Sequence, residues 1–394
     1  MTKTSLSKRI KRHIIGRIRP YFAATAPGAE TICCRELSGL ALSTQDATVV
    51  KGGIEFKGCL QDCYLANLHL RTASRILMRI HNFRASGFKQ LESKTVEIPW
   101  ELYLPSKSSP QIHTTAKHCR LYHTDAICER LMKSISKHGI DDTDKGGQKE
   151  GSLSAPKIFV RGVDDQFTIS IDSSGEHLHK RGIKIYPGRA PLRETIAAAA
   201  LLLAGYRGDE PVIDPMCGTG TFSLEAALMV KNIPPGWFRE FAFMEWPSFR
   251  RKKWEYLKRQ CQTHFAGPQA PTIFASDKDP SACRRLEKEL TENRLTDVIQ
   301  VINQDFFDFL PRDLTDQTGL VAINPPYGRR LENRPKSETL FIRICTRLKR
   351  EYKGWKVILI SPNRHLINKV PFRLEVQPIF HGGLRPVLMI GTIA

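Results

Sequence analysis

The sequence predicts a two-part protein, with an α+β region in its first half and a doubly wound parallel α/β domain in its second half. In the first half, short apolar runs alternate with turn residues and with basic helical segments. From about Tyr186, strand-like and helix-like segments alternate along the chain. This alternation is typical of a parallel sheet with helices on both faces. The length of 394 residues fits roughly two to three domains.

The charge of the chain favours a polyanionic partner. Its 60 Lys and Arg against 40 Asp and Glu give a net charge of +20, and the pI is about 9.6. Such an excess binds phosphates with release of counterions. An acidic membrane surface attracts the same charge, but no apolar run approaches the ~20 residues that cross a bilayer. We therefore expect no membrane partner.

The cysteines and histidines show no metal-site spacing. The ten cysteines include no Cys-x-x-Cys pair, and pairs of that kind mark structural zinc sites. No secretory signal is apparent. We expect reduced thiols, a cytoplasmic protein and no bound metal.

The first half is expected to contain two segments, 1–20 and 21–185. Residues 1–20 are basic and lack acidic residues. We interpret them as a disordered arm that touches RNA or as a solvated tail, and less readily as an organellar presequence. A hairpin is expected at Gly52-Gly53. Apolar residues at helical spacing predict one helix over 62–83, and residues 141–157 predict a polar loop.

Residues 186–394 carry the alternating pattern of the α/β domain. Its expected elements are a helix at 193–205, a strand at 211–214, a helix after 220, a strand at 272–277, a helix at 280–294, strands at 298–305 and 319–324, a further helix, and a strand at 356–361. An aromatic and basic insertion at 232–265 is expected to cover the active site, to contact RNA or to pack on the outside.

A glycine loop follows the first strand of this domain. The stretch "VIDPMCGTGTFSLEAA" ends a strand at Asp214, turns at Gly218 and Gly220, and starts a helix. Glycines let a backbone approach a ligand, and a helix N-terminus offers free N–H groups to an anionic group. The stretch lacks the lysine of a P-loop and the third glycine of the dinucleotide fingerprint. A plain helix-starting turn is the alternative.

Acidic residues also end the next two strands, at Asp277 and Asp305. Ligands of open sheets bind at that edge. Asp279 is explained as a helix N-cap before Pro280, which leaves Asp277 to bind ribose hydroxyls. Asp305 either accepts from an adenine amine or caps a helix. A nucleoside that carries a carboxylate and an adenine fits this set, which points to S-adenosylmethionine.

The stretch Asn324-Pro325-Pro326-Tyr327 ends a strand with two prolines, which cannot continue a sheet. It is either a rigid turn or a clamp for an exocyclic amine. In a clamp, Asn324 Oδ1 and the Pro325 carbonyl accept the amine hydrogens. Tyr327 stacks on a flipped base, a contact worth roughly 1–3 kcal/mol. Alignment with the sulfonium supplies much of the acceleration, so no strong base is needed.

Together these motifs resemble a known family. "DPMCGTGT", "ASDKDP", "NQD" and "NPPYG" are similar to class I S-adenosylmethionine-dependent methyltransferases that act on amines. "SSGEHLHKRGIKIYPGRAPLRETIAAA" and "CRLYHTDAICERL" resemble the subgroup with an N-terminal THUMP domain, which includes the bacterial 23S rRNA guanine-N2 methyltransferase and related tRNA enzymes. The resemblance covers nearly the whole chain from about residue 21. It implies a ferredoxin-like and THUMP RNA-binding region followed by a Rossmann-like methyltransferase domain.

The resemblance also implies roles for individual residues. The catalytic tetrapeptide would be Asn324, Pro325, Pro326 and Tyr327. The cofactor would be bound by Asp214, Pro215, Cys217, Gly218, Thr219, Gly220, Asp277, Asp305, Arg193 and Glu194. RNA would contact Lys117, Arg120, Lys180, Arg181 and Arg329, although the turn at 179–181 is equally well explained as solvated. Some relatives continue into a second methyltransferase domain, and we expect no second activity here.

The implied reaction is methyl transfer from S-adenosylmethionine to guanine N2 in RNA, foremost 23S rRNA or a precursor ribosomal particle. The same tetrapeptide serves enzymes that methylate adenine N6 and the amide nitrogen of glutamine. The alternatives are therefore a tRNA guanine-N2 enzyme, a DNA adenine-N6 enzyme, a protein glutamine methyltransferase, and a non-catalytic ribosome-assembly factor. The basic first half argues against the DNA and protein substrates.

Overall fold

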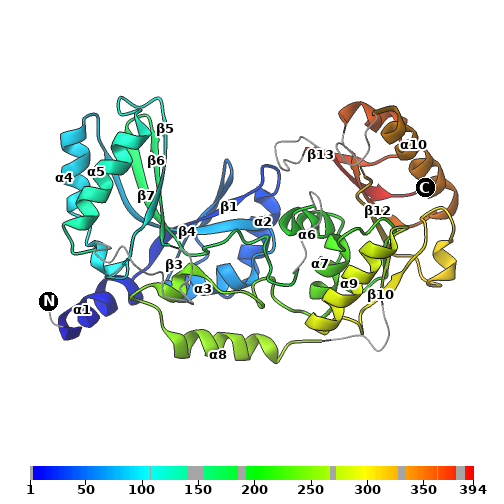
Figure 1. Cartoon of the computed structure of the whole chain (residues 1–394), viewed down its shortest axis with the longest axis horizontal. Helices are drawn as coiled ribbons and strands as arrows, with labels where there is room; N and C mark the ends of the chain where they lie inside the picture. Colours follow the sequence, from blue (N-terminus) through cyan, green and yellow to red (C-terminus); the bar gives the residue numbers. More distant parts are fainter. Residues whose placement is uncertain are drawn as a thin grey trace. The chain divides into compact units, whose positions relative to one another are not determined.

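The computed structural model of the chain forms two compact units (Figure 1). Unit 1 comprises Met1–Thr25, Cys34–Leu178 and Arg239–Lys258, and unit 2 comprises Ala26–Cys33, His179–Phe238 and Arg259–Ala394. The described residues are 3–106, 108–140, 155–184, 192–266, 272–326, 334–361, 363–378 and 387–394. Most of the polar loop expected at 141–157 lies outside them.

The division of the chain differs from the expected domains in two respects, and the first is that Ala26–Cys33, expected in the first half, belongs to unit 2. The passage between the units after Leu178 is close to the expected boundary at 185. However, the segment Arg239–Lys258 was expected in the second domain and folds in unit 1. Most of the insertion is therefore part of the N-terminal unit in space, although it interrupts the methyltransferase-like half in sequence.

Unit 1 is built on a seven-stranded sheet with the order β2-β3-β1-β4-β7-β6-β5. The strands are β1 (Arg19–Thr25), β2 (Ala47–Val50), β3 (Gly53–Gly58), β4 (Ala73–Arg84), β5 (Gln111–Lys117), β6 (Lys157–Val163) and β7 (Gln166–Asp172). The helices of this half are α1 (Lys3–Ile10), α2 (Glu30–Ser38), α3 (Leu60–His69), α4 (Phe88–Val96) and α5 (Thr124–Ser136), and the inserted segment contributes most of α8 (Arg251–Gln262). The first residues of α2, up to Cys33, belong to unit 2. All neighbouring strands of this sheet are antiparallel except β5 and β6. The expected hairpin is confirmed, since β2 pairs with β3 and Gly52 takes the positive φ of +86° that the turn requires.

The basic N-terminus is helical and packed, and the expectation of a disordered arm is wrong for the described residues. Helix α1 continues into a short π-helix at Lys11–Ile15. Ile10 and Ile14 are buried, and Arg9 forms a 2.7 Å ion pair with Glu101. The apolar spacing of these isoleucines on a helix explains why this segment packs.

The single helix expected over 62–83 is also wrong. Helix α3 ends at His69, and β4 follows from Ala73. In β4, Ile76 and Met78 are buried and belong to a strand. The stretch "SRILMRIHNF" mixes β-branched and straight side chains, so the same apolar residues fit a helix or a strand, and pairing with β1 and β7 decides the outcome.

Unit 2 contains a second seven-stranded sheet with the order β10-β9-β8-β11-β12-β14-β13. The strands are β8 (Val212–Asp214), β9 (Ile273–Ser276), β10 (Ile299–Ile302), β11 (Leu320–Ile323), β12 (Lys356–Ser361), β13 (Glu375–Pro378) and β14 (Val387–Thr392). The helices are α6 (Glu194–Leu203), α7 (Thr221–Val230), α9 (Pro280–Asn293) and α10 (Arg334–Glu351). Strands β10 to β12 pair in parallel, and β14 and β13 extend the sheet antiparallel. The predicted doubly wound sheet is confirmed.

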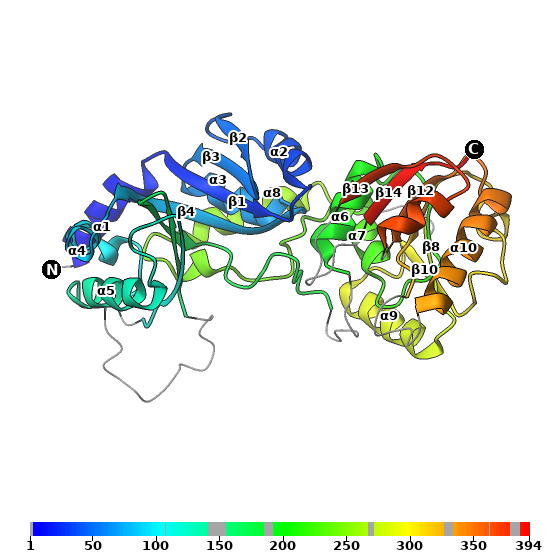
Figure 2. The ribbon, with the colours of Figure 1, turned by 90° about the horizontal axis from the view of Figure 1, so that it is seen from above.

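Both faces of the unit 2 sheet are covered, which explains its continuous apolar strands. In β11, Leu320 and Ala322 join a core with α6, α7 and α9, while Val321 and Ile323 join a core with α10. Figure 2 shows α6 and α7 on one side of the sheet and α10 on the other. The burial of both faces leaves the strand ends as the accessible part of the sheet. Among the described residues, no helix is long and apolar enough to span a membrane.

We predict that Phe243→Ala destabilises unit 1 by about 3–5 kcal/mol, because it removes a fully buried ring from the core. Phe243 lies in the inserted segment, and its ring stacks on Tyr64 of α3 with 4.5 Å between centroids. The matched control is Tyr256→Ala, which removes an aromatic ring that is 46% exposed from the same segment. Denaturant unfolding measures both, and equal small effects would contradict the packing described for the insertion.

Candidate active site at the edge of the parallel sheet

The glycine loop connects β8 to α7 in a conformation that requires glycine. Gly218 and Gly220 have φ of +54° and +66°. A Cβ on Gly220 would lie 2.5 Å from Leu286 Cδ1, whereas a Cβ on Gly218 would meet no atom within 4 Å. The Cys217 amide donates to the Ser276 carbonyl at the end of β9. The loop is thus packed against α9 at Gly220, bonded to β9 at Cys217 and open at Gly218.

Asp214, at the end of β8, holds the helix that follows this loop through hydrogen bonds with Ser223. It is buried, and its Oδ2 accepts hydrogen bonds from the Ser223 amide at 3.3 Å and the Ser223 hydroxyl at 2.8 Å. Burial raises the pKa of this carboxyl to about 7, and the bonds from Ser223 oppose the rise. The carboxylate is therefore engaged with the first turn of α7.

Asp277, which the sequence predicts to bind ribose hydroxyls, follows β9 and is half-buried. Its Oδ2 accepts from the Gly218 amide at 2.9 Å, and its Oδ1 accepts from the Asp279 amide at 2.9 Å. Asn303, a residue missed by the sequence reasoning, donates to the Asp277 carbonyl at 2.9 Å. Asp279 caps α9 by accepting from the Ser281 amide, with Pro280 in the first turn, as predicted.

Asp305 follows β10 and turns the chain there. Its Oδ1 accepts from the Phe307 amide at 3.0 Å, which is an Asx-turn and not a helix cap. Because β10, β9 and β8 are parallel neighbours, all three acidic strand ends lie along one edge of the sheet. Pro215 and Thr219 belong to the same glycine loop between β8 and α7.

Asn324 and Pro325 follow β11, which is the other neighbour of β8. Asn324 Oδ1 is buried and has no hydrogen-bond partner within the part of the chain that the structure describes. A buried acceptor without a donor is uncommon in folded proteins and calls for an explanation. Pro325 is buried and Pro326 half-buried. Tyr327 and Arg329 lie outside the described residues.

Lys184 ties the glycine loop to α6 and was missed by the sequence reasoning. Its Nζ donates to the Thr221 hydroxyl at 2.7 Å and to the Thr219 hydroxyl at 3.4 Å. It also forms a 3.0 Å ion pair with Glu194. Glu194, expected to bind cofactor, therefore already holds Lys184 at the loop. Arg193 is exposed just before α6.

One of the expected RNA contacts is wrong. Arg181 is buried and forms a two-pronged ion pair with Glu225 of α7, with Nε–Oε1 at 2.8 Å and Nη2–Oε2 at 3.3 Å. A guanidinium committed to a buried carboxylate is not available to phosphate. Lys180 is exposed in unit 2, and Lys117 and Arg120 are exposed at the end of β5 in unit 1.

The described site fits an adenosyl cofactor with a carboxylate end. Gly218 leaves open space in front of the loop, Asp277 lies beside it, and Asp305 lies further along the edge. Asn324 Oδ1, for which the described part of the chain offers no donor, adds an acceptor at the end of the strand next to β8. This arrangement matches the binding edge of doubly wound sheets.

Comparison with family models matches both units. Residues 181–374 match UPF0020, described as an RMKL-like methyltransferase domain, and residues 20–77 match an RlmL ferredoxin-like domain. The predicted fold class, a ferredoxin-like region followed by a Rossmann-like methyltransferase domain, is confirmed.

Comparison with curated proteins gives relatives of two lengths. The putative RNA methyltransferase slr0064 of Synechocystis sp. is 32% identical over 94% of this chain and 96% of that protein. The ribosomal RNA large subunit methyltransferase K/L of Methylococcus capsulatus is 30% identical over 95% of this chain but only 51% of that protein. The chain thus spans about half the length of this K/L relative.

Two solved structures resemble the chain over its whole length. SMU.472, a putative methyltransferase complexed with SAH, has a TM-score of 0.82 at 26% identity and covers 96% of this chain and 99% of its own. A predicted N6-adenine-specific DNA methylase from Listeria monocytogenes has a TM-score of 0.83 at 28% identity, with coverage of 99% and 98%. SAH is what S-adenosylmethionine becomes after giving up its methyl group, so the SMU.472 structure holds the product form of the cofactor that the sequence predicts for this chain.

We predict that the Asp214 carboxyl makes the cofactor-free protein less stable as the pH rises from about 4 to about 7. The pKa of this carboxyl in the folded protein, about 7, lies above its ordinary value of 3.8. In this window the unfolded state has lost a proton that the folded state retains. The free energy of unfolding therefore falls by about 1.4 kcal/mol per pH unit. Asp214→Asn keeps the acceptor for Ser223 and should abolish this component. Unfolding curves of the two proteins between pH 5 and 8 test it, and parallel curves would mean that Asp214 is ionised throughout.

Proposed function

We propose that this protein is a guanine-N2 methyltransferase that acts on 23S rRNA. The chain belongs to the RMKL-like family of S-adenosylmethionine-dependent RNA methyltransferases. The family establishes methyl transfer to RNA and the cofactor. The base, the atom that accepts the methyl group and the RNA are the parts that we propose.

The cofactor supplies a methyl group on a sulfonium, and this chain supplies the surface that holds it. We assign the carboxylate end to the backbone around Gly218, the ribose hydroxyls to Asp277, and the adenine amine to Asp305. Asp214 and Lys184 act behind the loop, because their side chains are bonded to Ser223 and to Thr221. Thr219 and Cys217 hold the loop's shape. This is a two-layer arrangement, with one set of residues at the ligand and another that fixes their backbone.

The observation that carries the reaction is that Asn324 Oδ1, beside the rigid Pro325, is buried and has no hydrogen-bond partner among the described residues. An exocyclic amine has two hydrogens and a nitrogen whose lone pair is delocalised into the ring. Acceptors at Asn324 Oδ1 and the Pro325 carbonyl would draw density back to that nitrogen and stabilise its developing positive charge. The excess proton of the methylated amine then leaves to solvent. Tyr327 is proposed to stack on the base.

Ribosomal RNA of the large subunit is favoured over the other substrates by two features, while the choice of guanine N2 rests on the motif resemblance. The K/L relative is named for large-subunit ribosomal RNA, and the first unit carries the RlmL-type ferredoxin-like domain. We propose that the rest of unit 1 is a THUMP domain, with the exposed Lys117 and Arg120 as RNA contacts. The name of the Listeria neighbour keeps adenine N6 in DNA as the second candidate, with a tRNA guanine-N2 enzyme third.

We predict that Asn324→Ala impairs methyl transfer and that Asp277→Ala impairs cofactor binding. Asn324→Ala should lower methyl transfer to RNA at least about 100-fold, as the loss of one positioned transition-state contact does, with cofactor affinity unchanged. Asp277→Ala should weaken cofactor binding, because it removes the carboxylate that we assign to the ribose hydroxyls and that accepts from the Gly218 amide. Calorimetry with S-adenosylhomocysteine and a tritiated-methyl assay on rRNA separate the two. Lost cofactor binding in a folded Asn324→Ala protein would make Asn324 a cofactor residue and contradict the amine clamp.

A further inference from the structure

The inserted segment Arg239–Lys258 is held on unit 1 by an aromatic cluster. Phe241 and Phe243 are fully buried, and Phe243 stacks on Tyr64 of α3. Trp254 of α8 packs edge-on against Tyr64 and Phe243 at 6.1 and 5.4 Å between centroids. The Arg250 amide donates to the Tyr64 hydroxyl at 3.2 Å. The start of α8 is therefore fixed in position against α3.

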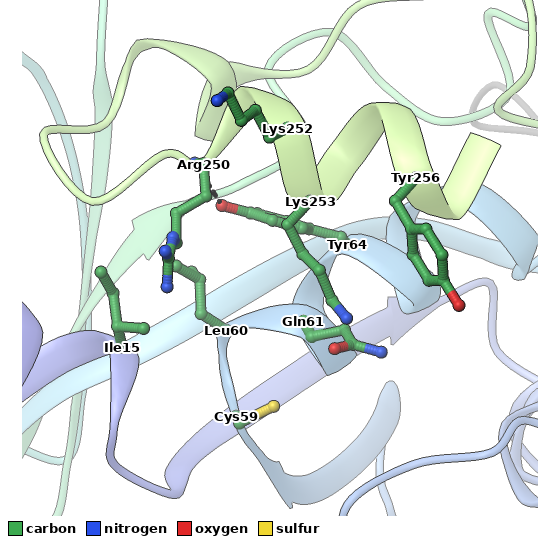
Figure 3. Close-up of a pocket in the computed structure, with 9 residues that line it drawn as sticks. All are labelled: Ile15, Cys59, Leu60, Gln61, Tyr64, Arg250, Lys252, Lys253 and Tyr256. Carbon is green, nitrogen blue, oxygen red and sulfur yellow. Dashed lines mark hydrogen bonds between the residues drawn. The ribbon is translucent and has the colours of Figure 1, made fainter. Parts of the chain in front are cut away.

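A pocket of ≈ 530 Å³ lies between this segment and α3, within the size range of about 300–1,000 Å³ that ligand sites show. Figure 3 shows its lining, which comes from α8, from the start of α3 and from the end of the N-terminal π-helix. The lining residues are Ile15, Cys59, Leu60, Gln61, Tyr64, Arg250, Lys252, Lys253 and Tyr256. They include three cations and no acidic residue.

The polar lining combines positive charge with an accessible ring. Lys253 Nζ lies 5.1 Å from the centroid of the Tyr256 ring, and Tyr256 is 46% exposed. In Figure 3, Lys253 and Tyr256 both extend from α8 toward the side of the pocket where Gln61 lies. Cations that pair with phosphate, next to an aromatic face on which a base stacks, are the two components of single-stranded nucleic-acid sites. None of these side chains takes part in the active site.

We propose that this pocket binds the backbone of single-stranded RNA, with phosphates at Arg250, Lys252 and Lys253 and a neighbouring base on Tyr256. The proposal rests on the proposed function in that RNA is the substrate, and it adds a contact region where the inserted segment lies against the ferredoxin-like domain. An acidic peptide would pair with the same cations but would leave the exposed ring unused, which is why RNA is the occupant that the lining favours.

The covalent path of the chain gives this site a consequence for catalysis. The chain leaves unit 2 after Phe238 and returns to it at Arg259, so the RNA contact is joined at both ends to the methyltransferase half. RNA held in the pocket is thereby tied by two short chain connections to the unit that carries the cofactor loop. Loss of the pocket should raise the KM for RNA and leave the affinity for cofactor unchanged.

The test uses the full chain and a fluorescein-labelled 20-nucleotide oligouridylate as the RNA probe. Lys252→Gln/Lys253→Gln should weaken binding at least tenfold in 100 mM KCl and should flatten the plot of log K against log salt by about 1.4, the value for two phosphates of a single strand. Tyr256→Ala should weaken binding at least about fivefold through the lost stacking. Arg251→Gln is the matched control, because it removes one exposed cation from α8 outside the pocket.

A second measurement locates the probe. Cys59 lines the pocket and Cys34 does not, and both are half-buried free thiols. Oligouridylate should slow the alkylation of Cys59 by iodoacetamide, read by peptide mass spectrometry, and should leave Cys34 unaffected.

The outcomes separate the pocket from the proposed function. If wild type methylates rRNA but the double and Tyr256 variants bind oligouridylate as wild type does, the pocket assignment is overturned and the function stands. Equal weakening of oligouridylate binding by Arg251→Gln would also overturn the pocket assignment, because the loss would then follow from the overall charge of the protein and not from this site. If wild type binds through the pocket but methylates no RNA, the proposed function fails and the binding site stands.

Discussion

The site depends on the parallel pairing of β8 with β9 on one side and β11 on the other. Parallel neighbours end at the same edge, so this pairing gathers the glycine loop, Asp277 and Asn324, which are spread over more than a hundred positions of the sequence. The pairing is stable because both faces of these strands are buried under helices. Anything that shifts β8 in register would displace the cofactor loop and the amine clamp together.

Side-chain hydrogen bonds and ion pairs fix the backbone of the glycine loop. Asp214 holds the first turn of α7, Lys184 holds the loop to α6 through Glu194, and Asp277 accepts from Gly218. The buried pair Arg181–Glu225 fixes the approach to α6 against α7. Asp214, Glu194 and Arg181 are ionisable groups that the sequence analysis predicted as ligand contacts. The structure uses them to make the loop rigid, and rigidity of this kind is what positions a cofactor for transfer.

Sequence patterns predicted the parts of the fold that local chemistry determines. The β8 loop needs glycines at positive φ, and Asp279-Pro280 carries the chemistry of a helix start, so both were predictable. The helix expected over 62–83 failed because Ile76 and Leu77 fit either period, and only pairing with β1 and β7 settles the choice. The place of the insertion was not predictable either, since stacking of Phe243 on Tyr64 joins residues 179 positions apart. Arg181 looked like a phosphate ligand because its partner Glu225 lies 44 positions further along the chain, on α7.

The central claim is that Asn324 and Pro325 clamp a guanine amine of ribosomal RNA. The most direct test is tritiated-methyl transfer to naked total rRNA, tRNA and DNA, followed by nucleoside digestion and mass spectrometry of the labelled product. The account predicts label in N2-methylguanosine of the 23S fraction. Label in N6-methyladenine of DNA would contradict the RNA assignment and keep the clamp, and label in no nucleic acid would contradict both.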